Sequence, residues 1–370
     1  MDPQETSRYR RQLSLAGFGP VAQNKLKEAH VAVIGAGGLG SPALLYLAGA
    51  GVGTVTIIDD DVVSVSNLHR QVIHTTDGVG TAKADSARAA MLALNPLIDV
   101  AVVGARLTGA NARDILADAD VVLDGSDNFG TRYLASWACA HLNIPHVWAS
   151  ILGFDAQLTV FHADNGPIYE DLFPTPPPAG SVPSCSQAGV LGPVVGVVGS
   201  AMALEAMKLI TDVGTPLIGR LAYYSALDGT WEYIPLQAAA GTVRRVIEEG
   251  PIAAATFEEP AATSVTTHDA SIPEVTTIPE GALVIDVREP HEHYQFSIPG
   301  ALLFPLGRIV DHDEYPPEIP EALAQGRPVV MQCAGGVRSA RAVDKLDTLG
   351  VTGTVSLAGG IDAWLDAQGT

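Results

Sequence analysis

A glycine-rich turn between a strand and a helix is the first feature of the chain that points to chemistry. Residues 31–40 read Val-Ala-Val-Ile-Gly-Ala-Gly-Gly-Leu-Gly. The glycines let the backbone approach a phosphate closely, and a helix starting near Ser41 would point its first amides at that anion. Asp59 follows Gly40 by 19 residues, where a carboxylate can hydrogen-bond a ribose hydroxyl. This turn alone predicts a nucleotide site, with NAD as the default ligand.

Charged residues beyond Asp59 shift the expectation toward ATP. Arg70, within Ser-Asn-Leu-His-Arg-Gln, and Lys83, after Gly-Thr-Ala, could neutralise the β and γ phosphates. Asp127 follows a strand expected at 121–124, at the carboxyl edge where such sheets bind ligands, and could hold Mg²⁺. Each of these two cations, taken alone, has another explanation. Arg70 could form a surface ion pair, and Lys83 could be a solvated helix residue.

Two of the three cysteines lie where a thiolate would be stabilised. Cys333 ends a strand and opens the loop Cys-Ala-Gly-Gly-Val-Arg, whose amides, together with Arg338, could hold an anionic sulfur or a persulfide. Cys185 precedes a long apolar helix and could attack an acyl-adenylate or a persulfide. The alternatives are a small buried turn residue for Cys185 and an unreactive strand end for Cys333. Cys139 lies in an apolar helix and is expected in the core.

The elements that must position these residues form two groups. From residue 30 to about 165 strand and helix patterns alternate, which predicts an α/β, Rossmann-like, mostly parallel sheet, and later strand patterns predict an antiparallel extension. We therefore expect an ATP-binding domain at 1–236. Residues 237–267, rich in Ala, Thr, Pro and Glu, are expected to form a linker. A second alternation predicts a small α/β domain at 268–370.

Composition excludes several kinds of partner. A net charge of −20 leaves no basic surface for nucleic acid. An odd number of widely spaced cysteines and an N-terminus without an apolar signal segment favour reduced thiols in a cytoplasmic protein. The uncharged run 188–204 contains Pro193 and meets Glu205 directly, so we expect a buried helix there and no membrane span.

Residues 7–236 closely resemble the bacterial E1-like activating enzymes of molybdopterin and thiamin biosynthesis. The blocks that carry the resemblance are 8–13, 18–19, 35–42, 51–53, 66–71, 80–83 and 126–128. The resemblance implies a fold of the E1 type and an ATP-dependent activity. It implies adenylation of the C-terminal glycine of a ubiquitin-like sulfur-carrier protein that ends in Gly-Gly.

The same resemblance implies roles for particular residues. Gly38 would contact the phosphates, Asp59 the ribose and Asp127 the Mg²⁺ ion. Arg11 would reach from an N-terminal arm into the partner subunit's site, which implies a homodimer. The other residues implied at the nucleotide site are Ser66, Asn67, Leu68, His69, Arg70, Lys83 and Asn128, of which Asn67, Arg70 and Lys83 would contact phosphates.

The chain departs from this family at one metal site. Many members carry a Cys-x-x-Cys pair before the Pro-rich crossover loop and a second pair after the last strands, and these bind a structural zinc. Here the first place reads Ile-Tyr-Glu-Asp at 168–171, and no cysteine lies between Cys185 and Cys333. We therefore expect no structural zinc, which puts the rigidity of the crossover loop in doubt. Cys185 itself lies where relatives carry a nucleophilic cysteine.

Residues from about 268 to 370 resemble single-domain rhodaneses through the segments 286–294, 296–301 and 357–364 and the six-residue loop that begins at Cys333. The fusion implies a two-step enzyme: adenylation of the carrier, then attack by a persulfide on Cys333, with Cys185 resolving or relaying the sulfur. A cysteine desulfurase is the expected kind of sulfur donor. Two other functions stay open: an NAD-dependent oxidoreductase with a regulatory rhodanese domain, and a non-catalytic scaffold that binds ubiquitin-like proteins.

Overall fold

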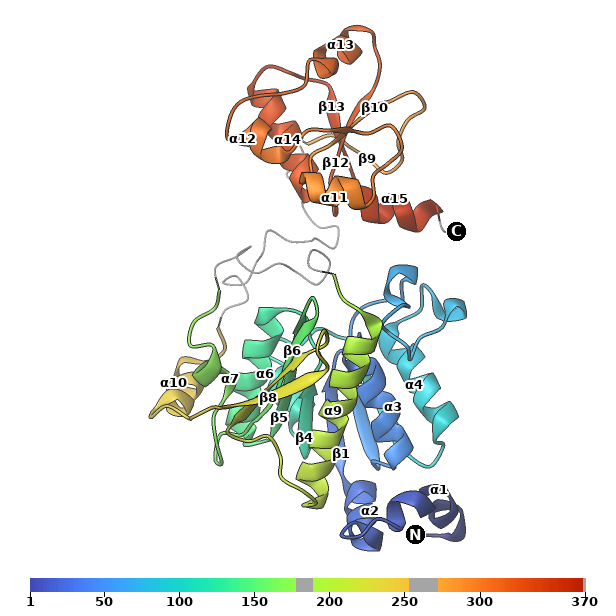
Figure 1. Cartoon of the computed structure of the whole chain (residues 1–370), viewed down its shortest axis with the longest axis vertical. Coiled ribbons are helices and arrows are strands. Elements are labelled where there is room, and N and C mark those ends of the chain that lie inside the picture. The colour runs from blue at the N-terminus through green and yellow to red at the C-terminus, as the bar shows by residue number, and fades with distance from the viewer. Residues whose placement is uncertain (178–188, 253–271, 369–370) are drawn as a thin grey trace. The chain divides into compact units, whose positions relative to one another are not determined.

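The computed structural model describes residues 1–177, 189–252 and 272–368. Its contacts divide the chain into two compact units, residues 1–257 and 258–370 (Figure 1). The first unit contains the glycine turn and the second contains Cys333. Each unit has its own sheet and is described by itself.

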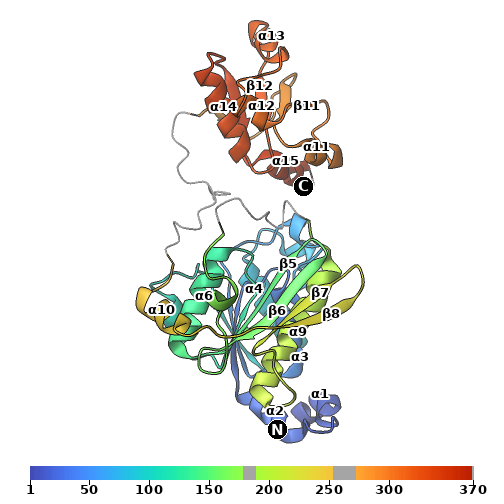
Figure 2. The ribbon, with the colours of Figure 1, turned by 60° about the vertical axis from the view of Figure 1, so that its left-hand side comes forward.

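An eight-stranded sheet forms the centre of the first unit, in the order β3-β2-β1-β4-β5-β6-β7-β8. Neighbouring strands run parallel from β3 to β5 and antiparallel from β5 to β8 (Figure 2). The prediction of a mostly parallel sheet with an antiparallel extension is confirmed. The strands are β1 (His30–Ile34), β2 (Thr54–Ile58), β3 (Asp99–Val103), β4 (Val121–Asp124), β5 (His146–Leu152), β6 (Asp155–Phe161), β7 (Arg220–Ser225) and β8 (Thr230–Pro235).

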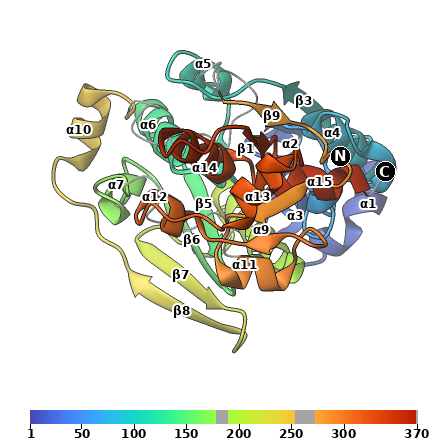
Figure 3. The ribbon, with the colours of Figure 1, turned by 90° about the horizontal axis from the view of Figure 1, so that it is seen from above.

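Helices cover both faces of this sheet. Contacts place α3, α4 and α9 together on one face and α5, α6 and α10 on the other. The hairpin β7–β8 projects at one edge (Figure 3). The helices are α1 (Pro3–Leu13), α2 (Gly19–Glu28), α3 (Gly40–Ala50), α4 (Lys83–Leu94), α5 (Ala112–Leu116), α6 (Phe129–Leu142), α7 (Tyr169–Leu172), α9 (Gly192–Thr211) and α10 (Thr242–Glu249), with short 3-10 turns at Val65–Asn67 and Thr76–Gly78.

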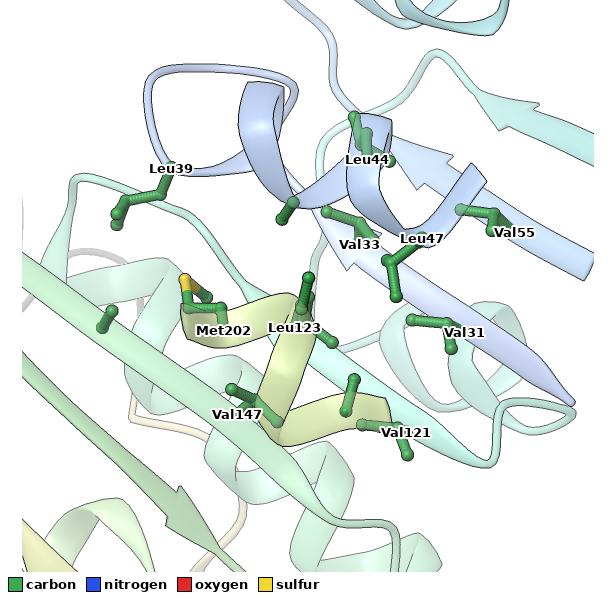
Figure 4. Packing of buried hydrophobic residues seen from close by; sticks show 14 of the residues in the cluster. Val31, Val33, Leu39, Leu44, Leu47, Val55, Val121, Leu123, Val147 and Met202 are labelled. Atoms are coloured by element: carbon green, nitrogen blue, oxygen red, sulfur yellow. The ribbon is translucent and has the colours of Figure 1, made fainter. Parts of the chain in front are cut away.

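The core explains why β1 is apolar on both sides. Alternate side chains of a strand point to opposite faces, so Val31 and Val33 pack in the cluster with α3 and α9 (Figure 4). Ala32 and Ile34 join the cluster with α5 and α6. All four are buried. Each fully buried Val or Ile contributes about 1.5–3 kcal/mol to stability, and this rigid strand ends directly at the glycine turn.

Helix α9 is long and apolar enough to cross a membrane by length and composition, but half of its most apolar 18-residue stretch is buried inside the unit. It packs against α3 and against β4, β5 and β6. Helix α9 is therefore a core helix of this unit, the arrangement that we expected for the uncharged run 188–204.

The segment expected to be a linker, 237–267, contains the helix α10 at Thr242–Glu249. In α10 Val246 is buried, Val243 is partly buried, and the helix packs on α6. Only one face of α10 is apolar, and the residues around the helix are rich in Ala and Thr. The composition of the segment therefore gave no sign that α10 contributes to the core.

The second unit is a five-stranded sheet in the order β11-β10-β12-β13-β9, with parallel pairing throughout. It is the small α/β domain that the second alternation predicted. Its strands are β9 (Glu274–Val275), β10 (Leu283–Asp286), β11 (Leu302–Leu303), β12 (Val329–Gln332) and β13 (Thr354–Leu357). Its helices are α11 (Pro290–Gln295), α12 (Leu306–Val310), α13 (Glu318–Ala324), α14 (Val337–Thr348) and α15 (Gly360–Gln368).

Candidate active sites

A cleft opens at the carboxyl ends of β1, β2 and β4 in the first unit. The glycine turn lines it, and α3 begins at Gly40. A Cβ atom on Gly40 would collide with the carbonyl oxygen of Gly35, so only glycine lets the turn close this tightly. The first amides of α3 therefore come next to the cleft, as an anion site requires.

Asp59 is tied to the glycine turn itself. Its Oδ2 accepts a hydrogen bond from the amide of Ala36 at 2.7 Å, and its Oδ1 accepts one from the amide of Asp61 at 2.9 Å. Burial raises the pKa of Asp59, while these two amides act in the opposite direction. The carboxylate lines the cleft in a fixed orientation.

Lys83 and Arg70, the two predicted cations, both line this cleft. Lys83 begins α4, is buried, and places its Nζ 2.9 Å from Oδ2 of Asp61. Asp61 was not predicted as a site residue, although it belongs to the acidic triplet at 59–61. The pair holds the ammonium group of Lys83 toward the exposed side of the cleft.

Residues 66–69 position Arg70 and do not line the cleft themselves. The guanidinium of Arg70 donates to Oδ1 of Asn67 at 2.9 Å and to the carbonyl oxygen of Ser66 at 3.2 Å. Its Nη1 lies 2.8 Å from Nε2 of His69. Burial and the charge of Arg70 both lower the pKa of His69, so that ring nitrogen is an acceptor at neutral pH. Leu68 ends the 3-10 turn that carries these residues.

Asp127 and Asn128 follow β4 and both line the cleft. The Oδ1 of Asn128 accepts a hydrogen bond from the amide of Thr131 at 2.8 Å, which makes Asn128 the N-cap of α6. Asp127 is exposed, and its carboxylate has no ion-pair partner among the residues that the structure describes. Gly38 lies in the same lining.

Like Asp61, the cleft residues Gln71, Arg106 and Arg132 were not among the sequence predictions. Arg132 is buried on α6 and lies over the rings of Phe129 and Trp148. Arg106 is a lone cation in the loop after β3, with no motif around it, so no signal in the sequence could have identified it. Arg11, by contrast, is exposed on α1 and is absent from the described lining of this cleft.

His74 binds the backbone of the glycine turn at Ala36. Its Nε2 lies 2.9 Å from the carbonyl oxygen of Ala36, and its Nδ1 lies 2.9 Å from Oγ of Ser86. Because a carbonyl only accepts, Nε2 carries the hydrogen and the hydroxyl of Ser86 donates to Nδ1. Burial lowers the pKa of His74, so the ring is neutral at pH 7.

Residues 168–171, which contain no cysteine, are held in place by hydrogen bonds and aromatic packing. The carboxylate of Asp171 accepts the amide of Ile168 at 2.9 Å and the amide of Ala239, beyond the last strand, also at 2.9 Å. Tyr169 packs edge-on against Tyr133 and Trp148 in a buried aromatic cluster. Asp171 thus joins the two segments that carry the zinc ligands in the resembling enzymes. Cys185 lies outside the described residues.

In the second unit Cys333 lies at the end of β12 with its side chain almost fully buried. Its Sγ accepts hydrogen bonds from the amide of Gly336 at 3.1 Å and that of Ser339 at 3.4 Å, and Oγ of Ser339 lies 3.5 Å away. Gly336 has a φ of +95°, a conformation that favours glycine and turns its amide inward. The predicted cradle of amides around the sulfur is present.

Arg338, the predicted partner of the charged sulfur, pairs with a carboxylate. Its Nη1 and Nη2 each donate a 2.7 Å hydrogen bond to the carboxylate of Glu292, on α11. The sequence prediction had Arg338 holding the charge on the sulfur of Cys333 together with the loop amides. Here the amides of Gly336 and Ser339 contact the sulfur, while Arg338 binds Glu292.

Helix α11 is anchored through Asp286, at the end of β10. Arg288 and His293 both contact its carboxylate, at 2.7 Å and 2.9 Å. Burial alone would raise the pKa of Asp286, but the hydrogen bonds from Arg288 and His293 hold it below its usual value. Arg288 also donates to the carbonyl oxygen of Phe296 at 2.7 Å, beyond the helix.

Family models match both units of the chain. The model of the ThiF family matches residues 9–244. The chain belongs to the ThiF family. A rhodanese-like domain matches residues 274–367 of this ThiF-family chain. The predicted resemblances to E1-like activating enzymes and to rhodaneses are both confirmed.

Two named relatives match almost the whole chain, and a third matches about two thirds of it. The probable adenylyltransferase/sulfurtransferase MoeZ of Mycobacterium tuberculosis is 42% identical over 98% of this chain and 93% of its own length. The adenylyltransferase and sulfurtransferase MOCS3-1 of Zea mays is 37% identical over 96% of the chain and 81% of its own length. The sulfur carrier protein adenylyltransferase of Thermus thermophilus is 48% identical over 63% of the chain and 88% of its own length.

A solved structure confirms the fold of the first unit. Escherichia coli MccB with ATP superposes with a TM-score of 0.55 at 21% identity, over 63% of this chain and 72% of that one. Membership of the ThiF family implies that the bound nucleotide is ATP, in place of the NAD that the glycine turn alone predicted.

Proposed function

We propose that this ThiF-family enzyme uses ATP to adenylate the C-terminal glycine of a ubiquitin-like sulfur-carrier protein and then converts it to a thiocarboxylate. The observation that carries the proposal is the cleft at the strand ends, which gathers Arg70, Lys83 and Asp127 around the glycine turn. Attack of a carboxylate on the α-phosphorus needs positioning and charge neutralisation, and no general base. The cleft provides both.

Each cleft residue then has a role. The amides of the glycine turn near Gly38 hold phosphates, Asp59 binds the ribose, and Arg70 and Lys83 neutralise the triphosphate. Ser66, Asn67 and His69 keep Arg70 extended through their hydrogen bonds. When ATP enters, Lys83 exchanges part of its contact with Asp61 for phosphate oxygens, so the lysine is oriented before the nucleotide binds.

Mg²⁺ fits Asp127. Mg²⁺ in nucleotide sites is held by one or two carboxylates together with the substrate's phosphates and water, and Asp127 supplies an exposed carboxylate on the cleft. The ion would supply charge neutralisation for the leaving pyrophosphate. Asn128, as the N-cap of α6, keeps Asp127 at the mouth of the cleft.

The second step uses the persulfide of Cys333. Its terminal sulfur attacks the carbonyl carbon of the acyl-adenylate, and AMP leaves with the electron pair of the broken C–O bond, which gives a carrier acyl disulfide on Cys333. The Cys185 thiolate then attacks the Cys333 sulfur. The carrier leaves as a thiocarboxylate, and the disulfide between the two cysteines returns to thiols by exchange with a cellular thiol. The alternative role for Cys185 is relaying sulfur.

We extend the proposal to a cytoplasmic homodimer. Exposed apolar side chains lie on neighbouring helices of one face: Tyr46 on α3, Leu94 on α4 and Leu204 on α9. Such a patch is typical of a protein interface. A second subunit there would bring an N-terminal arm with it, and Arg11, exposed and outside its own cleft, is the residue that this arm would carry into the partner's site.

Carrier-dependent exchange of pyrophosphate into ATP tests the first step. The proposal expects exchange only when a Gly-Gly-ended carrier is present. Carrier binding without exchange would support the non-catalytic scaffold instead, and binding of NAD without ATP would support the oxidoreductase. A cysteine desulfurase is the proposed sulfur donor for the second step.

A further inference from the structure

The Cys333 loop contains a single cation, and a neighbouring helix neutralises it. Residues 334–337 are uncharged, and Arg338 gives both terminal nitrogens to the carboxylate of Glu292 at 2.7 Å. The pair is partly exposed, with 28% of the Arg338 side chain and 20% of the Glu292 side chain accessible. A sulfur donor that approaches the loop therefore meets a closed ion pair.

Glu292 is fixed from its other side as well. Its Oε2 also accepts the amide of Glu289 at 2.9 Å, in the first turn of α11. Burial alone would raise the pKa of Glu292, but the bonds from Arg338 and Glu289 hold it below its usual value, so it remains an anion at neutral pH. Asp286 anchors the same helix through His293. The carboxylate cannot easily leave Arg338.

A second arginine of this sheet edge is neutralised as well. Arg288 is buried against Asp286. Residues 268–370 contain 15 acidic and six basic residues, so the surrounding field is negative. A small dianion such as thiosulfate would have to approach Cys333 against this field, and the arginine of the Cys333 loop is already paired with Glu292.

The surface around the loop offers apolar contact instead. The amide of Ile361, in α15, donates to the carbonyl oxygen of Cys333, so α15 flanks the loop on one side and α11 flanks it through Glu292. Tyr294 on α11, Phe296 just after it and Leu365 on α15 are exposed, at 80%, 45% and 40%. A protein can use such contacts, and a small anion cannot.

We propose that Glu292 selects the sulfur donor of Cys333, disfavouring small dianionic donors and favouring a persulfide carried on a protein. The inference rests on the proposed persulfide chemistry of Cys333. With a protein persulfide, the Cys333 thiolate attacks the protonated outer sulfur, the S–S bond breaks, and the donor thiolate leaves. With thiosulfate the same attack expels sulfite, which carries away the electron pair.

The test compares the whole enzyme with Glu292→Gln and with Glu289→Gln, which removes the same charge from the same helix turn without freeing Arg338. Thiosulfate:cyanide sulfur transfer and transfer from a desulfurase carrying labelled persulfide are measured for each. We expect Glu292→Gln to lower the KM for thiosulfate about tenfold, since one unpaired cation then faces a dianion. Transfer from the desulfurase should change less than twofold, and Glu289→Gln should resemble the native enzyme.

Two further variants separate charge from structure. Glu292→Asp keeps the carboxylate and should restore the native thiosulfate KM, and Arg338→Met added to Glu292→Gln should remove the gain. The inference is wrong if Glu292→Gln loses both transfers together, or if it and Glu289→Gln shift the thiosulfate KM equally. Failure of the native enzyme to load Cys333 from any donor would instead refute the proposed function itself.

Discussion

Lys83 lies with its ammonium nitrogen 2.9 Å from the carboxylate of Asp61, 22 residues earlier in the chain. Only 8% of the lysine side chain is exposed, whereas 69% of the aspartate side chain is. The buried lysine stem is therefore held in place while its charged end faces the cleft. The enzyme does not have to order a flexible lysine when ATP binds.

Removing this charge should slow adenylation without unfolding the domain. We expect Lys83→Ala to reduce carrier-dependent pyrophosphate exchange about 100-fold, the usual loss for one preorganised charged donor. The matched control is Lys25→Ala, which breaks a surface pair with Asp212 far from the cleft lining and should leave exchange within twofold. Equal effects of the two substitutions would show that Lys83 acts only on stability.

Gly40 and Gly49 lie on the same helix, α3, and differ in the space around them. A Cβ on Gly40 would collide with the backbone of Gly35, whereas one on Gly49 would meet only Cδ2 of Leu94 at 3.9 Å. We expect Gly40→Ala to lower the free energy of unfolding by about 3 kcal/mol and Gly49→Ala to raise it by up to about 1 kcal/mol. Chemical denaturation measures both, and a stable Gly40→Ala variant would contradict the tight turn.

His74 should make the stability of the first unit fall at acid pH. Burial lowers its pKa in the folded state, so the unfolded chain binds the proton more readily and stability falls as the pH drops below the ordinary histidine value of about 6.5. One such group contributes a slope of at most about 1.4 kcal/mol per pH unit. Thermal unfolding of the native chain and His74→Gln from pH 7.5 to 5 (about the histidine range) should show the smaller slope in the variant. Parallel dependence of stability on pH in the two proteins would show that His74 does not cause the sensitivity to acid.

Ser339 should support the reactive sulfur through its hydroxyl, which donates to the carbonyl oxygen of Gly336 at 2.8 Å and lies 3.5 Å from Sγ of Cys333. Ser339→Ala removes both contacts, so we expect the thiolate to be less well stabilised and Cys333 to react more slowly. One hydrogen bond contributes about 1 kcal/mol, which corresponds to about fivefold slower alkylation of the Cys333 peptide at a fixed pH, as followed by mass spectrometry. Ser356→Ala, whose hydroxyl lies 3.0 Å from Oγ of Ser339, should slow alkylation less. Equal rates in the native enzyme and Ser339→Ala would contradict this role.

Local patterns in the sequence predicted the parts of the sites that depend on neighbours in the chain. The glycine turn, the position of Asp59 and the amide cradle of Cys333 are each built within a few residues of one strand end, where a strand-to-helix turn dictates the geometry. The mostly parallel pairing of the first sheet also followed from the alternation of strands with helices. These predictions needed no knowledge of distant contacts.

Other features depend on contacts between distant segments, which the sequence does not display. Glu292 and Arg338 are 46 residues apart, and Arg106 reaches the cleft from a loop without any motif. Asp171 accepts hydrogen bonds from the amides of Ile168 and of Ala239, which is 68 residues after Asp171, and no cysteine pattern could indicate this link. Such pairings are set by the packed fold and not by local spacing.

The most direct test of the account compares pyrophosphate exchange and thiocarboxylate formation in the native enzyme and Cys333→Ala. With a Gly-Gly-ended carrier, ATP and a loaded desulfurase, the native enzyme should replace an oxygen of the carrier's terminal carboxylate with sulfur, which mass spectrometry detects. Cys333→Ala should retain full carrier-dependent exchange and form no thiocarboxylate. Thiocarboxylate formation by Cys333→Ala at the native rate, or absence of exchange with the native enzyme, would contradict the account.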